Sequence, residues 1–107
     1  MAESFGALTE SVFYILLSLF EPMHGYGIMQ NVKALSRGRV SMGAGTLYGA
    51  ISTLVEKGWI KPLENASDER KKEYVITDTG RRIVAAELSR LEELLQNGRQ
   101  IYGGDPS

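Results

Sequence analysis

Apolar residues recur at helical spacing in four stretches of the chain. Each stretch carries apolar side chains three or four positions apart, which is the pattern of a helix with one face on a core. The stretches are residues 10–20, 26–35, 43–57 and 77–102. Thr9 precedes the first as an N-cap, and Pro22 ends it because proline interrupts a helix. Gly38 and Gly58 follow the second and third as left-handed caps. Gly98 is expected to weaken or end the last helix near its final turn.

Two strands are predicted between the third and fourth helices. One arm begins at Trp59 and the other covers residues 73–76, with the turn-rich segment 65–70 between them. Pro62 indicates that the first arm is an edge strand or carries a bulge, because proline has no N–H to donate to a ladder. A further, very short strand is predicted at Arg39–Val40.

This order of elements predicts a winged helix-turn-helix, a mainly α fold of the α+β class with a small ribbon. The chain of 107 residues has room for one domain. A domain of that size often buries a leftover apolar helix against a second copy. We therefore expect a DNA-binding domain at 1–78, a C-terminal dimerisation helix at 79–102 and a loose tail at 103–107.

The third predicted helix carries glycines on the face turned away from Leu47 and Ile51. At 100° per residue, that outward face consists of Gly45, Gly49, Ser52 and Glu56, flanked by Thr46, Thr53 and Tyr48. Each interior glycine costs about 1 kcal/mol against alanine. A slim face lets a helix into a DNA major groove, and a start at Ser41 or Gly43 brings backbone amides near phosphates. Close packing against a neighbouring helix would explain the same pattern, so both interpretations stand.

Basic residues concentrate in the middle of the chain. The net charge is −1, but residues 24–82 carry ten Lys or Arg against six Asp or Glu, a balance of ten minus six, or +4. The candidate phosphate contacts are Lys33, Arg37 and Arg39 around the second helix, and Arg70, Lys71 and Lys72 in the ribbon. Asp68, Glu69 and Glu73 partly cancel the charge of the ribbon, so a solvated hairpin tip is the competing interpretation.

The sequence offers little catalytic or metal-binding chemistry. His24 is the only histidine and there is no cysteine, so the usual zinc ligands are missing. We therefore expect that the protein is not an enzyme and binds no cofactor or metal, and we interpret His24 as a helix cap. The longest apolar run, residues 12–17, is far shorter than the ~20 residues of a membrane helix. The absence of cysteine fits a cytoplasmic protein.

Five motifs together resemble the PadR family of transcriptional regulators. They are His24-Gly25-Tyr26-Gly27, Gly45-Thr46-Leu47-Tyr48, Glu56-Lys57-Gly58, Arg70-Lys71-Lys72 and Thr77-Asp78-Thr79-Gly80. The resemblance runs from about residue 8 to 95. It implies homodimers that bind operator DNA with dyad symmetry, usually as repressors, several of which respond to small apolar or aromatic compounds. It also implies that Thr46, Tyr48, Arg70 and Lys71 face DNA and that Tyr26 lies near the DNA backbone.

The last predicted helix supplies a candidate dimer contact. Its seam residues, which step by four, three and four positions like a short heptad pattern, are Val84, Leu88, Leu91 and Leu95. The resemblance implies that this helix packs against the partner subunit. Residues 85–95 contain no aromatic side chain, unlike relatives that hold drugs between aromatic rings. A closed seam is therefore an alternative to an open ligand pore.

The sequence thus predicts a sequence-specific DNA-binding regulator, a homodimeric repressor released by a small apolar effector. The predicted partners are double-stranded operator DNA and a second copy of the chain. The predicted DNA-binding residues are Tyr26, Lys33, Ser41, Gly43, Gly45, Thr46, Tyr48, Gly49, Ser52, Arg70, Lys71 and Lys72. The alternative is a winged-helix module that binds a protein or a ligand and has little specific DNA affinity.

Overall fold

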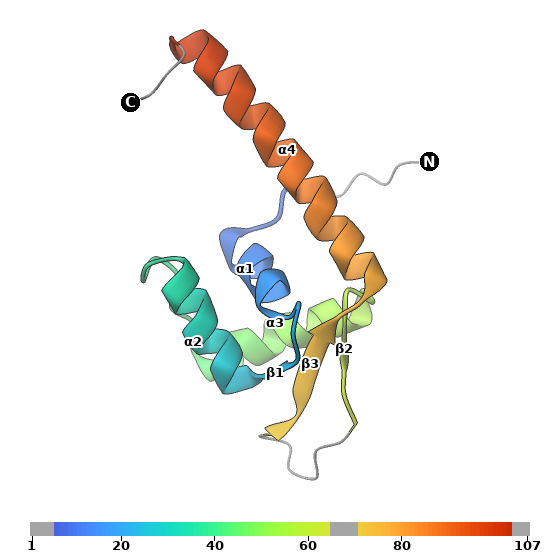
Figure 1. The fold of residues 1–107 in the computed structure, drawn as a ribbon. Coiled ribbons are helices and arrows are strands. Elements are labelled where there is room, and N and C mark those ends of the chain that lie inside the picture. The colour runs from blue at the N-terminus through green and yellow to red at the C-terminus, as the bar shows by residue number, and fades with distance from the viewer. Residues whose placement is uncertain (1–5, 65–70, 104–107) are drawn as a thin grey trace.

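The computed structural model describes residues 6–64 and 71–103 of the chain. The elements are α1 (Glu10–Ser18), β1 (Met23–His24), α2 (Gly25–Leu35), α3 (Ala44–Glu56), β2 (Ile60–Pro62), β3 (Glu73–Ile76) and α4 (Asp78–Tyr102). Their order is the predicted one apart from the position of the short strand. Figure 1 shows α1, α2, α3 and the sheet gathered in one body, with the ribbon of β2 and β3 at one end and α4 projecting from the other.

Side-chain caps begin three of the four helices in this part of the chain, and two of them match the prediction in detail. Thr9 Oγ1 accepts a hydrogen bond from the Val12 N–H at 3.1 Å, and His24 Nδ1 accepts one from the Gly27 N–H at 3.1 Å. Thr77 caps α4 in the same way. Each cap satisfies a backbone donor that the first helical turn leaves without a partner. His24 is therefore a structural cap, as predicted.

The end of α2 differs from the prediction by one residue. Gly38 has a left-handed φ of 84°, but Arg37 before it is also left-handed, with a φ of 54°. The Gly38 N–H donates to the Lys33 carbonyl at 2.8 Å, which closes the helix end. The predicted left-handed cap at Gly58 is confirmed, with a φ of 78° after α3.

The sheet has the strand order β1-β3-β2, and both pairings are antiparallel. Pro62 lies in the edge strand β2, as predicted. The strand predicted at Arg39–Val40 is wrong, and Met23–His24 form the third strand instead. The reason is a local side-chain hydrogen bond that replaces the strand pairing. Ser36 Oγ accepts the Val40 N–H at 2.9 Å, so this donor is not available to a ladder.

The core lies where the three short helices, the sheet and the start of α4 meet. Its members, all 9% exposed or less, are Ile15, Leu16, Leu19, Ile28, Val32, Leu47, Ile51, Leu54, Trp59, Ile60, Tyr74, Ile76, Ile83 and Val84. The predicted inner stripe of α3 is therefore confirmed at Leu47, Ile51 and Leu54. A polar link joins the first two helices, because Asn31 Nδ2 donates to Ser18 Oγ at 2.9 Å.

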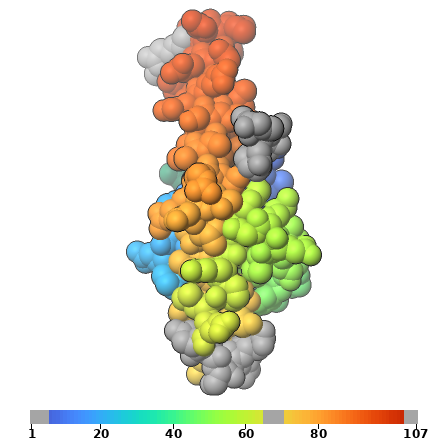
Figure 2. Space-filling model, turned by 90° about the vertical axis from the view of Figure 1, so that its right-hand side faces the viewer, coloured from blue at the N-terminus to red at the C-terminus, as the bar shows by residue number. Residues whose placement is uncertain are grey.

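Only the beginning of α4 packs on its own subunit. Val84 is 3% exposed and lies in the core of its own subunit. It is therefore not available for the predicted contact with a second copy. From Leu88 onward the helix stands clear of the body (Figures 1 and 2). The helix does not end at Gly98, because α4 continues to Tyr102; whether Gly98 weakens its last turn stays a prediction. A single glycine costs only about 1 kcal/mol, and the surrounding Glu, Leu, Gln and Arg residues favour a helix.

Candidate nucleic-acid interface

The outward face of α3 is open and almost free of side chains. Gly45 and Gly49 are exposed, and a Cβ added at either position would meet no heavy atom within 4 Å. Ser52, Thr46 and Tyr48 on and beside this face are exposed as well. The small residues therefore do not pack against another described helix of the same subunit. This open face is what insertion into a DNA groove would require.

The beginning of α3 differs from the beginnings of the other helices. Its N-cap is Gly43, which makes no side-chain capping bond, whereas Thr9, His24 and Thr77 cap the other three described helices. Both Ser41 and Gly43 are exposed. The first-turn amides of α3 therefore keep their hydrogen-bonding capacity for solvent or for an anion, which the helix dipole favours.

One side of α3 faces the ribbon across a groove of about 370 Å³. Ser52 and Glu56 line it from the helix, and Lys72 and Tyr74 line it from the ribbon. The structure thus brings two predicted DNA contacts, Ser52 and Lys72, to the same surface. Lys71 is exposed. Arg70 lies outside the described residues.

Tyr26 and Tyr48, the two tyrosines that the family resemblance places near DNA, both lie near the start of α2. Tyr26 is 62% exposed and its hydroxyl accepts a hydrogen bond from Gln30 Nε2 at 3.2 Å. Tyr48 reaches from α3 to Gly25, the first residue of α2. Sequence reasoning missed this contact, because the two residues are 23 positions apart and only the fold brings them together.

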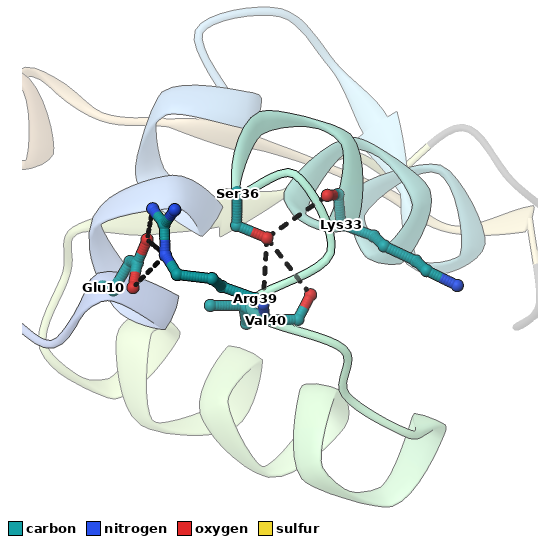
Figure 3. Close-up of polar contacts among 5 residues, drawn as sticks. All are labelled: Glu10, Lys33, Ser36, Arg39 and Val40. Atoms are coloured by element: carbon teal, nitrogen blue, oxygen red, sulfur yellow. Dashed lines mark hydrogen bonds and ion pairs between the residues drawn. The ribbon is translucent and has the colours of Figure 1, made fainter.

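The basic residues around α2 do not form one phosphate-binding set. Arg39 donates through Nε to Glu10 Oε2 at 3.1 Å, and its second terminal nitrogen contacts the same carboxylate. The hydrogen bond to Glu10 and its charge raise the pKa of Arg39 above its ordinary value. Figure 3 shows Arg39 turned to Glu10 while the Lys33 side chain extends in the opposite direction. Lys33 remains an exposed basic group, whereas Glu10 neutralises Arg39.

The figure also shows what holds Arg39 in place. Ser36 is fully buried, and its hydroxyl bonds to the Lys33 carbonyl at 3.2 Å as well as to the backbone of Val40 (Figure 3). The turn between α2 and α3 is thereby fixed around one buried side chain. The pairing of Glu10 with Arg39 ties the same turn to α1. The spacing of α2 and α3 is therefore set by contacts outside the open face.

No group of three or more His, Cys, Asp and Glu residues within ranges 6–64 and 71–103 is placed to hold a metal ion. Among the helices described, none combines the length and the apolar character needed to cross a membrane.

The sequence matches the transcriptional regulator PadR-like family over residues 13–86, more than half of the chain. It is also 33% identical over 85 residues to an uncharacterized 37.1 kDa protein in a transposon of Streptomyces fradiae. That match covers 79% of this chain and 23% of the relative, so the chain spans less than a quarter of the relative's length.

Two solved structures illustrate the fold that this chain shares. The structure of a PadR family transcriptional regulator from Eggerthella lenta DSM 2243 superposes with a TM-score of 0.68 at 24% identity, covering 88% of this chain and 82% of that one. The structure of RosR from H. salinarum superposes with a TM-score of 0.63 at 28% identity, covering 84% of this chain and 76% of that one.

Proposed function

Because this chain belongs to the PadR-like family of transcriptional regulators, whose function is DNA-binding regulation, we propose that it is a homodimeric repressor of an operator with dyad symmetry. In this proposal α3 enters the major groove and the ribbon contacts the flanking phosphates. Two copies joined through α4 would present two α3 helices to half-sites about 34 Å apart, one turn of DNA.

The open face of α3 is the observation that carries the proposal. Gly45 and Gly49 leave the helix slim on the side that the core does not use, and Gly43 leaves its first amides without a side-chain cap. A helix with this shape can bring its backbone close to base edges and phosphates. Lys33, Lys71 and Lys72 would add phosphate contacts, so the affinity should fall steeply as salt rises.

Position 49 allows a direct test of this face. Gly49 is exposed and a Cβ added there meets no atom of the subunit within 4 Å, so a side chain at this position removes the helix penalty of glycine without a clash at its Cβ. Gly49→Ala and Gly49→Leu should therefore both unfold at a higher temperature than the wild-type protein. Their affinity for DNA should nevertheless fall, slightly for Gly49→Ala and at least tenfold for Gly49→Leu, because the larger side chain holds the helix out of the groove.

The measurement is a titration with DNA from upstream of the chain's own gene, against a scrambled duplex, at two salt concentrations. Specific binding that weakens with salt and with side-chain size at position 49 supports the proposal. Equal affinity for both duplexes would favour the alternative, a winged-helix module that binds a protein or a ligand. Unchanged affinity in Gly49→Leu would show that α3 does not enter the groove.

A cavity beside α3 supports the proposed release by a small apolar compound. It measures about 530 Å³ and lies between the segment before α1 and one side of α3. Leu8, Val12, Leu54 and Trp59 give it an apolar lining, and Lys57 Nζ stands 5.1 Å from the centre of the Trp59 ring. Trp59 is the only tryptophan, so tryptophan fluorescence reports on this cavity. A compound that releases the operator without changing this fluorescence would place the effector site elsewhere.

A further inference from the structure

The contact between α2 and α3 depends on a missing side chain at position 25. A Cβ added to Gly25 would lie 2.2 Å from Tyr48 Oη, 2.7 Å from Cζ and 3.3 Å from Cε1. The first two distances are shorter than a Cβ makes with any non-bonded heavy atom. Gly25 is buried, and the end of the Tyr48 ring fills the space that any other residue would occupy.

The Tyr48 side chain is nevertheless not a core residue. It remains 40% exposed, while its neighbour Leu47 is fully buried. The hydroxyl end of the ring lies against Gly25 at the start of α2, on a residue that begins beside the open face of α3. A tyrosine held at its far end loses much of its rotational freedom before it meets a partner, which lowers the entropy cost of binding.

We propose that Gly25 is a positioning residue for DNA binding, because it provides the seat that orients Tyr48 beside the α3 groove face. The inference rests on the proposed function and adds to it. It assigns to α2 a role that does not require Gly25 to touch DNA. It also joins two sequence motifs, the one around Gly25 and the one around Tyr48, into a single structural unit.

The substitution Gly25→Ala displaces the ring without removing it. The atoms in the way belong to the end of a flexible side chain, so the ring can swing aside and the subunit should still fold. Gly25→Ala should lose about tenfold in operator affinity, equivalent to one lost contact of ~1.4 kcal/mol. Tyr48→Ala should lose a similar factor. The double variant should bind no more weakly than Tyr48→Ala alone, because the first substitution acts only through the second residue.

Thermal unfolding tests the seat independently of DNA. With Tyr48 present, Gly25→Ala should lower the Tm, because the displaced ring loses its packing. With alanine at position 48, the same substitution should raise the Tm, because alanine favours a helix over glycine. Gly98→Ala is the matched control, since nothing lies within 4 Å of a Cβ at position 98. It should raise the Tm by the same amount in both backgrounds.

Three results would overturn the inference. The first is wild-type affinity in Gly25→Ala. The second is an equal loss of affinity when Gly25→Ala is added to the wild-type protein and to the Tyr48→Ala variant, which would mean that position 25 acts without the ring. The third is a wild-type protein that binds no duplex better than the scrambled control. In that case the proposed function fails with it, and the Tm coupling between positions 25 and 48 would remain as packing alone.

Discussion

The two halves of α4 carry the same apolar periodicity but occupy different environments. In the first half, Ile83 and Val84 are 3% exposed and lie in the core. In the second half, Leu88 and Leu95 are 51% and 53% exposed. Figure 2 shows this second half as a column rising beyond the rest of the molecule. One continuous stripe is therefore covered by the subunit only at its beginning.

The difference shows where the subunit ends and where a partner would begin. Burying a leucine side chain is worth about 1.5–3 kcal/mol, so a row of exposed leucines is costly to leave in water. Four leucines of the second half share this exposure: Leu88, Leu91, Leu94 and Leu95. Three of them, Leu88, Leu91 and Leu95, share one face at helical spacing, and a second copy with the same stripe would cover that face. This supports the proposed homodimer and limits the proposed seam to residues after Val84.

The strongest test of the packed half is Gly80→Ala. A Cβ at Gly80 would lie 2.2 Å from the Trp59 carbonyl oxygen and 2.6 Å from Ile76 Cγ1. The obstacle is backbone, and it is held in place because Thr77 N–H donates to the same Trp59 carbonyl at 3.0 Å. We expect a loss of about 3 kcal/mol in the free energy of unfolding, measured by urea denaturation. A loss below about 0.5 kcal/mol would show that α4 can shift away from β2 at little cost.

The strongest test of the exposed half is Leu88→Asp. Its side chain is half exposed, so the isolated subunit should keep its fold and its circular dichroism spectrum. A charge at the proposed seam would be buried twice in each dimer, and the dimer dissociation constant should rise at least a hundredfold, which is about 2.7 kcal/mol. Sedimentation velocity at micromolar concentration measures this directly. A variant that still sediments as a dimer would exclude Leu88 from the seam.

Leu88→Asp also has a matched counterpart in the packed half. Val84→Asp places the same charge one helical turn earlier, but in a side chain that is 3% exposed. It should unfold the subunit instead of splitting a dimer. If both variants behaved alike, the boundary between the halves would be misplaced.

The boundary itself is marked by an ion pair. Glu87 is 6% exposed, and its carboxylate accepts hydrogen bonds from Arg90 Nε at 2.9 Å and from a terminal nitrogen at 2.6 Å. These bonds lower the pKa of Glu87, an effect that burial opposes, and the backbone of Leu8 lowers it further. The pair therefore lies at the point where the helix leaves the body of the subunit.

The pKa of Glu87 gives the sign of a pH effect. Its folded pKa lies below the unfolded value of about 4.3. The carboxylate therefore stabilises the fold above that pH, and the stability is lost as the pH falls through the folded pKa. Glu87→Gln should lower the Tm by a few degrees at neutral pH and by less at acid pH. A loss that does not depend on pH would show that the ionised form of Glu87 contributes nothing.

The sequence predicted features that depend on residues a few positions apart, and it missed contacts between residues far apart in the chain. The caps at Thr9 and His24, the bounds of α3 and its open glycine face follow from residues a few positions apart, and the structure agrees with them. The seat of Tyr48 on Gly25 joins residues far apart in the sequence, and no local pattern marks it. The prediction therefore located the surface of α3 but not what orients the side chains on it.

The boundary within α4 was missed for a related reason. Val84 and Leu88 have the same apolar chemistry and sit one turn apart, so periodicity assigns both to one seam. Which of them the core covers depends on the direction in which α4 leaves the sheet. Gly80 sets that direction by allowing α4 to approach Trp59 closely. By helix propensity alone Gly80 is only a small cost, whereas the packing of α4 requires a glycine at this position.

The smallest predicted effect is the one that sharpens the contrast most. Gly98→Ala makes the same chemical change as Gly80→Ala in the same helix, but nothing lies within 4 Å of the added Cβ in the subunit. It should raise the free energy of unfolding by about 0.5–1 kcal/mol, because only helix propensity changes. Equilibrium unfolding over a range of protein concentrations measures it. A gain that holds in the monomeric Leu88→Asp background but disappears in the dimer would mean that the partner approaches α4 closely at Gly98. In that case the exposed half would also need a glycine for packing, supplied between subunits instead of within one.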